Sequence, residues 1–149
     1  MKGTSFQRIS THAIEQAIKK YANSKSAVAF TYQNLGHAFY VLVFDEATWV
    51  YDAATGLWHE WLFSNLGEFE RHRLEHLSYI PKKGIFVGGD YSNNKVYLLN
   101  DETYTDDGTS ITRLRTSPHI SNELRRVFYS EFLLDAEVGV GLPGDVVGS

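Results

Sequence analysis

Five consecutive residues near the middle of the chain have the side chains of a zinc site. They are His72-Arg73-Leu74-Glu75-His76, and the H-x-x-E-H spacing is that of inverted zinc metalloproteases, in which two imidazoles hold the metal and the glutamate acts as general base. That chemistry requires a helix, because on a strand the two imidazoles would lie roughly 13 Å apart at about 3.3 Å per residue. The apolar residues Phe69 and Leu77 leave a short helical turn open.

The residues around this motif favour a strand or a loop over a helix. Gly67 and Pro81 flank it, and segments of strand-like sequence precede and follow it. A third ligand would have to come from Glu131 or Glu137, which no spacing argument brings close. We therefore expect a solvated polar edge and no catalytic, cofactor-binding or metal-binding residue, with a zinc hydrolase kept as an alternative.

Three further patterns resemble ligand sites, but each lacks a necessary part. The run Gly139-Val-Gly-Leu-Pro-Gly144 reads G-x-G-x-x-G, yet only five residues follow it and no helix can hold a pyrophosphate. An acidic loop suggests calcium, but Gly108 at EF-hand position six would place threonines at positions one and three; its acids are Asp101, Asp106 and Asp107. One predicted strand face is expected to be solvated, with a cation site as the alternative; it carries Glu131, Asp135 and Glu137.

No motif for nucleophilic catalysis is present. The chain contains no cysteine and no G-x-S-x-G, and the remaining histidines fall one per predicted element: His12, His37, His59 and His119. Since His37 follows a turn glycine and begins an aromatic strand, we expect it to be a hydrogen-bonded structural residue.

The basic and tryptophan side chains have structural interpretations. We expect the basic ones to solubilise the surface or to pair between subunits; they are Lys82, Lys83, Arg113, Arg115, Arg125 and Arg126. The tryptophans are expected in the core, with a contact anchor as the alternative; they are Trp49, Trp58 and Trp61.

Length and composition indicate one ordinary β-rich domain. The 149 residues are 43% hydrophobic and 14% aromatic, which suits pleated, half-buried strands. The formal charge of −4 argues against direct binding of nucleic acid, because that binding depends on many Lys and Arg side chains. The first residues lack the apolar core of a secretory leader, and no apolar run reaches the length of a membrane span.

The hydrophobic period changes from helical to strand-like early in the chain. Apolar residues at helical spacing after Ser10 and Thr11 predict a helix over about 11–22. Alternating residues then predict four antiparallel strands in chain order: Val28–Tyr32, His37–Phe44, Thr48–Tyr51 and Leu57–Trp61. The turns between them are Asn34-Leu35-Gly36, Asp45-Glu46-Ala47 and Asp52–Gly56.

A second series of strands resembles the first. It comprises Gly84–Gly89, Lys95–Leu99 and Thr109–Arg115. Phe39 matches Phe86 at a spacing of 47, and Val50-Tyr51 matches Val96-Tyr97 at a spacing of 46, within the range of propeller blades. The prediction is an all-β partial propeller of antiparallel meander blades with one short N-terminal helix, whose sheet edges lie open.

These elements predict one domain with four parts. Residues 8–26 form a helical lead-in, 27–65 a first blade, 66–120 a second blade, and 121–149 an additional strand and a glycine-rich tail. The additional strand is expected over about 127–138.

Several motifs in order resemble the packaged-DNA stabilisation, or tail-hub, family of short-tailed phages. The resemblance covers most of residues 8–141 and rests on Ile9–Glu15, Gly36–Phe44, Thr48–Asp52, Thr55–Glu60, Val87–Asp90, Val96–Leu99, Tyr104–Gly108 and Glu137–Gly141. It implies a non-enzymatic virion protein built of propeller blades, which assembles as a ring beneath the portal and closes the channel after DNA entry. Because family members are several times longer, the chain is expected to be a fragment.

The resemblance also sets the expected partners and location. They are copies of the chain and neighbouring portal and tail proteins in the phage tail, after synthesis in the bacterial cytoplasm. No small-molecule substrate, cofactor, sequence-specific nucleic acid or membrane is expected. A glycan- or receptor-binding β domain is the first alternative and the zinc hydrolase the second.

Overall fold

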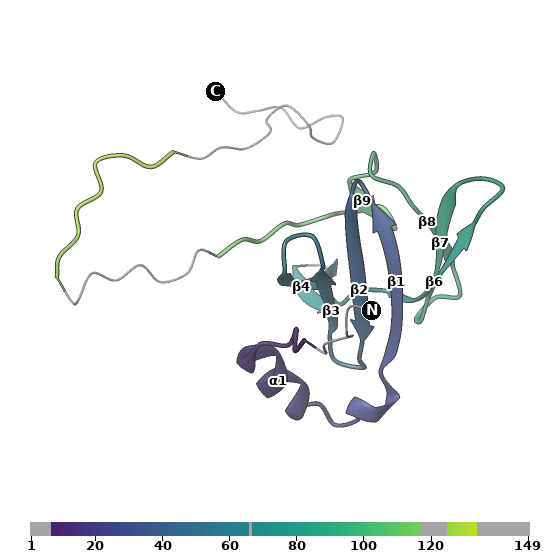
Figure 1. The fold of residues 1–149 in the computed structure, drawn as a ribbon. Helices are drawn as coiled ribbons and strands as arrows, with labels where there is room; N and C mark the ends of the chain where they lie inside the picture. Colours follow the sequence, from purple (N-terminus) through teal and green to yellow (C-terminus); the bar gives the residue numbers. More distant parts are fainter. Residues whose placement is uncertain (1–6, 66, 117–124, 134–149) are drawn as a thin grey trace, which may run out of the picture. The chain divides into compact units, whose positions relative to one another are not determined.

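The computed structural model describes residues 7–65, 67–116 and 125–133. The chain divides into two compact units, Met1–Asp101 and Glu102–Ser149. The described residues form one α-helix, one short 3-10 helix and ten strands in antiparallel sheets (Figure 1). The predicted all-β architecture with one N-terminal helix is confirmed. None of the helices among these residues is long and apolar enough to cross a bilayer.

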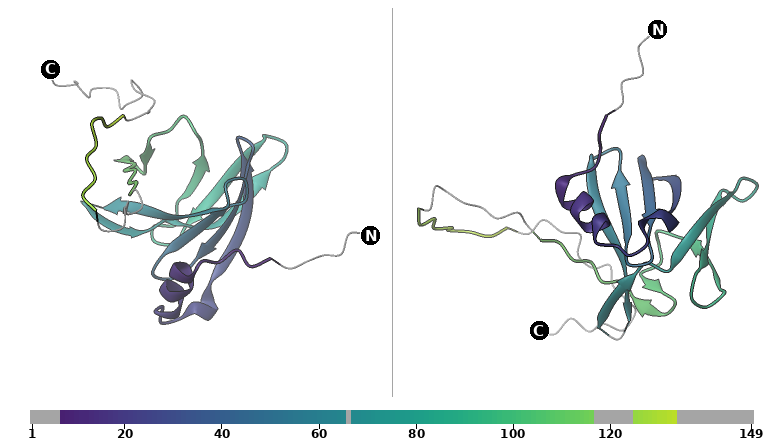
Figure 2. Two further views of the ribbon diagram at one scale, coloured as in Figure 1. Left: turned by 60° about the vertical axis from the view of Figure 1, so that its left-hand side comes forward. Right: turned by 90° about the horizontal axis from the view of Figure 1, so that it is seen from below.

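Helix α1, His12–Lys19, lies beside the first sheet (Figures 1 and 2). Thr11 caps it, as predicted, because its hydroxyl accepts the backbone N–H of Ile14 at 3.3 Å. The helix is shorter than the predicted 11–22. After Lys19 the N–H groups of Lys20 and Tyr21 donate to carbonyls three residues earlier, and the N–H of Ala22 donates to the Glu46 carboxylate at 2.9 Å. The short helix η1, Ser24–Ser26, then leads into the sheet.

The first sheet contains five strands in chain order, every neighbouring pair antiparallel. They are β1 Val28–Asn34, β2 His37–Val43, β3 Thr48–Asp52, β4 Leu57–Asn65 and β5 Glu68–Arg71. The β1–β2 turn is the two-residue type whose residues both need positive φ, and Leu35 at 47° and Gly36 at 82° supply it. The predicted hairpin is confirmed, whereas β4 runs beyond the predicted Trp61 and β5 was not predicted.

The core of this unit lies on one face of β2 and β3. Val41 and Val50 pair directly across these strands and are completely buried, and Val43 is nearly so. The side chains packed around them are Val28, Phe30, Tyr32, Phe39 and Trp61. Burying such a cluster supplies the apolar contacts that hold a small sheet together.

The second sheet has three antiparallel strands, β6 Leu74–Ile80, β7 Ile85–Asp90 and β8 Val96–Leu99. Its register repeats that of the first sheet. Val41 pairs with Val50 in the first sheet, and Gly88 pairs with Tyr97 in the second, both 47 residues later. The predicted match of Val50 to Val96 at a spacing of 46 is therefore wrong by one residue. The error matters because a one-residue slip turns a strand's side chains to the opposite face.

The unit Glu102–Ser149 contains a small hairpin of β9 Thr105–Asp106 and β10 Thr109–Ser110. Asp107 and Gly108 at its tip both have positive φ, at 51° and 83°. The predicted strand over Thr109–Arg115 is wrong beyond Ser110, because the described residues 111–116 have no regular structure. The strand predicted from 127 is also wrong as far as 133, and its remainder lies outside the described residues. Alternating side chains set a face, but a strand also needs a partner for its backbone groups.

Candidate functional site at the junction of the two sheets

The H-x-x-E-H motif lies where the chain passes from the first sheet to the second. Strand β6 begins at Leu74, so Glu75 and His76 lie on a strand and His72 precedes it. The helix that would bring the two imidazoles together does not form, and the zinc hydrolase alternative is wrong for this reason. Within the described ranges, no group of three or more potential ligands could hold a metal ion. Glu137 lies outside those ranges.

His72 packs inside the junction. Its ring centroid lies 5.1 Å from that of Trp61, its backbone N–H donates to the Trp61 carbonyl at 3.2 Å, and its Nδ1 accepts the backbone N–H of Leu74 at 3.2 Å. Burial lowers the pKa of His72 to about 4, opposed by the charge of Asp90. The imidazole is therefore neutral near pH 7 and acts as a packing group.

Two arginines on either side of His72 make contacts that join the sheets. Arg71 donates from Nη1 to the carbonyl of Phe44, after β2, at 3.1 Å, and its guanidinium lies 3.6 Å from the ring centroid of Tyr91, after β7. The guanidinium thus contacts the residue after β2 in the first sheet and the residue after β7 in the second. Stacking on an aromatic face adds cation–π attraction to the hydrogen bond.

Arg73 makes the second of these contacts. Its guanidinium lies 3.8 Å from the ring centroid of Phe63 on β4, and Nη1 lies 3.5 Å from the Asp90 carboxylate at the end of β7. Burial opposes ionisation of Asp90, but hydrogen bonds from Ser92 and the charge of Arg73 keep its pKa below the ordinary value. The sequence analysis did not predict the contacts of Arg71 and Arg73. The signal that could have indicated them is a pair of arginines on either side of His72, between strands rich in aromatic residues.

A second histidine closes the turn that follows β3. Nδ1 of His37 lies 2.7 Å from the carboxylate of Asp52. Burial raises the pKa of Asp52, but hydrogen bonds from Thr55 and the Ala54 N–H and the contact with His37 outweigh it, so the pKa is lowered overall. The hydrogen-bonded structural histidine predicted at position 37 is observed.

The tryptophans bind the N-terminal segment to the first sheet. The indole N–H of Trp49 donates to the Tyr21 hydroxyl at 2.8 Å, and that of Trp58 donates to the carbonyl of Ile9 at 2.9 Å. Trp61 packs against the valine core. All three are half-buried, and of the three only Trp61 packs against the valine core, so the prediction of core tryptophans holds for Trp61 and the contact anchor stays an alternative for Trp49 and Trp58.

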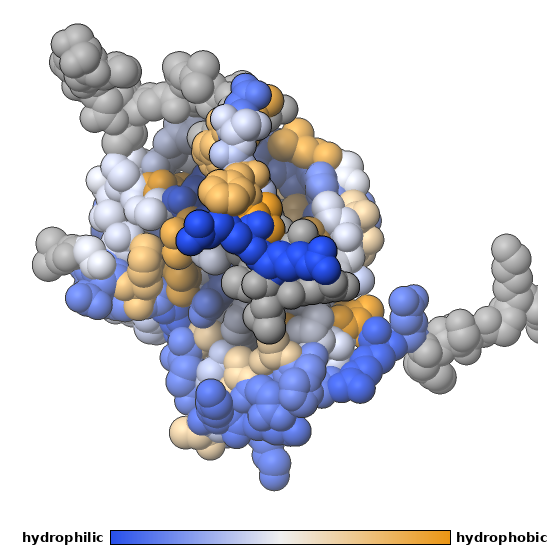
Figure 3. All heavy atoms as spheres, turned by 90° about the vertical axis from the view of Figure 1, so that its left-hand side faces the viewer, coloured by the Kyte–Doolittle hydropathy of each residue, from blue (hydrophilic) through white to orange (hydrophobic). Residues whose placement is uncertain are grey.

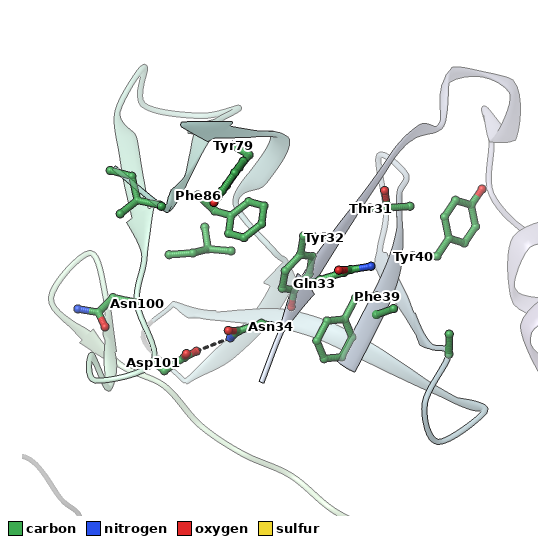
Figure 4. A pocket seen from close by; sticks show the side chains of 15 residues that line it. Thr31, Tyr32, Gln33, Asn34, Phe39, Tyr40, Tyr79, Phe86, Asn100 and Asp101 are labelled. Atoms are coloured by element: carbon green, nitrogen blue, oxygen red, sulfur yellow. Dashed lines mark hydrogen bonds between the residues drawn. The ribbon is translucent and has the colours of Figure 1, made fainter. Parts of the chain in front are cut away.

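An open groove of about 1090 Å³ lies between β1 and β2 and the second sheet. Tyr32 lies between Phe39 and Phe86 in it (Figure 4), with ring centroids 4.8 and 5.9 Å away, and Phe86 is 4.8 Å from Tyr79. Tyr32 and Tyr79 are themselves 47 residues apart. Aromatic rings from both sheets therefore line this groove. Burial among them raises the pKa of Tyr32.

The groove has a polar end. The amide of Asn34 donates to the Asp101 carboxylate at 2.8 Å (Figure 4). This bond links the first hairpin with the residues that follow β8. Asp101, one of the acids in the loop that does not fit the calcium-binding pattern, therefore has a structural partner in Asn34.

The other sequence candidates do not gather at this junction. His12 lies on α1 and His59 on β4, while Lys82 and Lys83 are exposed in the turn after β6. Arg113, Arg115, Arg125, Arg126 and Glu131 are exposed in the second unit, where Arg126 lies 5.8 Å from the ring of Phe128. His119, Asp135, Glu137 and Gly139–Gly144 lie outside the described residues. Polar and apolar residues alternate in patches on the face in Figure 3.

The two sheets and the contacts between them are typical of one class of protein. Two antiparallel sheets repeat one register and are joined by aromatic and arginine contacts, which is the construction of a β-propeller scaffold. The chain belongs to the family described as "Bacteriophage P22 Gp10, beta-propeller", whose model matches residues 1–104. No curated protein and no solved structure matches the chain significantly.

Membership of this family carries a function. It is a family of structural phage proteins without enzymatic activity, which stabilise DNA as tail accessory proteins. Its context is tail assembly, and its members are virion proteins. The resemblance, the fold class and the non-enzymatic phage role predicted from the sequence are confirmed.

Proposed function

We propose that the chain forms part of a phage tail hub that keeps packaged DNA in the head by closing the portal channel through protein–protein contacts. The observation that carries this proposal is the family match over residues 1–104, which spans every strand of both large sheets. The formal charge of −4 supports closure by protein rather than a grip on DNA phosphates.

The two sheets are proposed to be consecutive blades. Their common 47-residue register, which relates β1–β3 to β6–β8, supports two consecutive repeats, and we propose that the blades span 27–65 and 66–120. Since β5 pairs with β4, we extend the first blade to Arg71. The contacts of Arg71 and Arg73 would then be the joint between neighbouring blades.

The proposed partners are further copies of the chain and the adjoining portal and tail proteins, in the tail of the particle. Assemblies of this kind form through apolar surfaces that are exposed in the isolated chain and become buried between chains. Exposed apolar residues occur in both units, for example Val96 at 71% and Phe132 at 88%.

The test uses the phage or prophage whose genome encodes the chain. An early stop codon in its gene should give particles that lose nuclease-protected DNA after packaging, and supplying the gene in trans should restore it. The measurement is the amount of protected DNA per particle by quantitative PCR, with mass spectrometry of the particle proteins. Particles that hold a full genome without the protein would contradict the proposal.

A further inference from the structure

Among the strands that the structure describes, β8 is the edge of the second sheet. The strand order is β6-β7-β8, and Val96 and Leu98 on one face of β8 are 71% and 53% exposed. In the first sheet the corresponding strand β3 is covered by β4. The residues 47 positions after β4 belong instead to the separate β9–β10 hairpin. In the part of the chain that the structure describes, the sheet order ends at β8.

The segment 125–133 has the composition of a strand but no strand conformation. Its apolar side chains are exposed, Phe128 at 82%, Tyr129 at 66% and Phe132 at 88%. Aromatic and branched residues of this kind suit a pleated sheet. A strand also requires a partner for its backbone hydrogen-bonding groups.

The charges of the segment and of the β8 edge are complementary in one arrangement. In an antiparallel pairing with Leu98 opposite Phe128, Lys95 comes opposite Glu131, and Asp101 opposite Arg125. A shift of one residue in either direction separates Lys95 from Glu131. A parallel pairing would set Lys95 against Arg125 and Asp101 against Glu131, which is repulsive.

We propose that residues 125–133 of a second copy of the chain add to β8 as its fourth strand. Strand addition satisfies the backbone groups of an open edge, and alternate side chains fix its register. It would cover Leu98 with Phe128. This inference rests on the self-assembly in the proposed function and names the strand that performs it.

The absence of cysteine from the chain allows a direct test with the full-length protein. A Leu98→Cys chain is mixed with a Phe128→Cys chain under mild oxidation, so that a disulfide between different chains reports pairing in trans. Both positions are well exposed, and the variants should fold. The expected product is a disulfide-linked heterodimer in high yield.

Leu57→Cys provides the matched control, because Leu57 is 55% exposed and lies on the first sheet. Mixed with Phe128→Cys, it should cross-link at background level. Adding Glu131→Lys to the Phe128→Cys chain should lower the yield about two- to fivefold, and adding Lys95→Glu to the Leu98→Cys chain should restore it. Equal yields in the test and control pairs, or no recovery, would overturn the proposed register.

Sedimentation of the unmodified chain separates this inference from the function on which it rests. If the chain forms oligomers but the Leu98–Phe128 pair does not cross-link, strand addition at β8 is wrong and self-assembly stands. If the chain stays monomeric at all concentrations and does not cross-link, both the strand addition and the proposed self-assembly are wrong.

Discussion

At the scale of single residues, His72 shows how a metal-like motif can become a packing group. Its imidazole is held against Trp61 and accepts a backbone N–H, and burial lowers its pKa to about 4. A histidine in the unfolded chain has a pKa near 6.5. Between about pH 4 and pH 6.5, the unfolded chain therefore binds more protons at this histidine than the folded chain does.

We expect His72 to make the folded state sensitive to mild acid. As the pH falls from about 6.5 to about 4, protonation of the unfolded chain should remove up to about 3 kcal/mol of the free energy of unfolding. Above pH 6.5 this contribution should be constant. Urea unfolding at several pH values measures it, and His72→Gln should flatten the dependence in this window.

The control for this prediction is His76→Gln, since His76 is exposed on β6 of the same motif. This variant should keep the pH dependence of the unmodified chain. If His72→Gln and the unmodified chain lose the same free energy between pH 6.5 and 4, the buried histidine is not the cause.

At the scale of elements, β6 and β7 approach each other closely at one glycine. A Cβ built on Gly88 would overlap the Leu74 side chain and lie 3.2 Å from the carbonyl oxygen of His76. Leu74 is 5% exposed and has little room to move. The next residue, Gly89, would meet nothing within 4 Å.

Gly88→Ala should therefore lower the free energy of unfolding by about 1–3 kcal/mol through overpacking. Gly89→Ala is the matched control and should change it by no more than about 0.5 kcal/mol. Thermal or urea unfolding of the two variants measures the difference. If the two variants lower the free energy of unfolding equally, the close approach of β6 and β7 at Gly88 does not limit the size of the side chain there.

The elements also show which parts of the fold the sequence predicts. The hairpin at Leu35-Gly36 was predicted, because alternating strands and a turn glycine both indicate it. Strand β5, Glu-Phe-Glu-Arg, was missed because its charged residues lack an apolar alternation; its exposure along most of its length explains why it tolerates them. The strand from 127 was predicted wrongly, because alternation says nothing about the presence of a partner edge.

The junction was less predictable than the fold. The structural role of His37 and the packing of Trp61 against the core follow from local patterns. The contacts of Arg71 and Arg73 join residues from β4, β7 and the loop after β2, which only the folded chain brings together.

At the scale of the whole molecule, the charge of the chain decides how it can act on DNA. With 14 Lys and Arg against 18 Asp and Glu, it lacks the cationic surface that releases counterions from phosphates. The arginines of the junction are engaged with rings, a carbonyl and a carboxylate.

We expect the purified chain to bind duplex DNA no more tightly than a neutral control protein at about 150 mM salt. Fluorescence anisotropy of a labelled duplex, titrated with the chain, measures this. Tight binding that weakens steeply as salt is added would contradict closure by protein contacts alone.

The constant register has a consequence for how such a chain can change in length. The pairs from Ala29–Leu42 to Gln33–Ala38 and from Phe39–Asp52 to Leu42–Trp49 each have a counterpart 47 positions later, and the repeat ends at a bulge in β6, where Asp90 pairs with Leu74 instead of Glu75. Where the first copy places Val41 against Val50, the second places Gly88 against Tyr97, so a missing side chain on one strand accompanies a larger ring on its neighbour. The repeated unit behaves as a cassette, and duplicating it would lengthen the scaffold while the geometry of every joint stays the same.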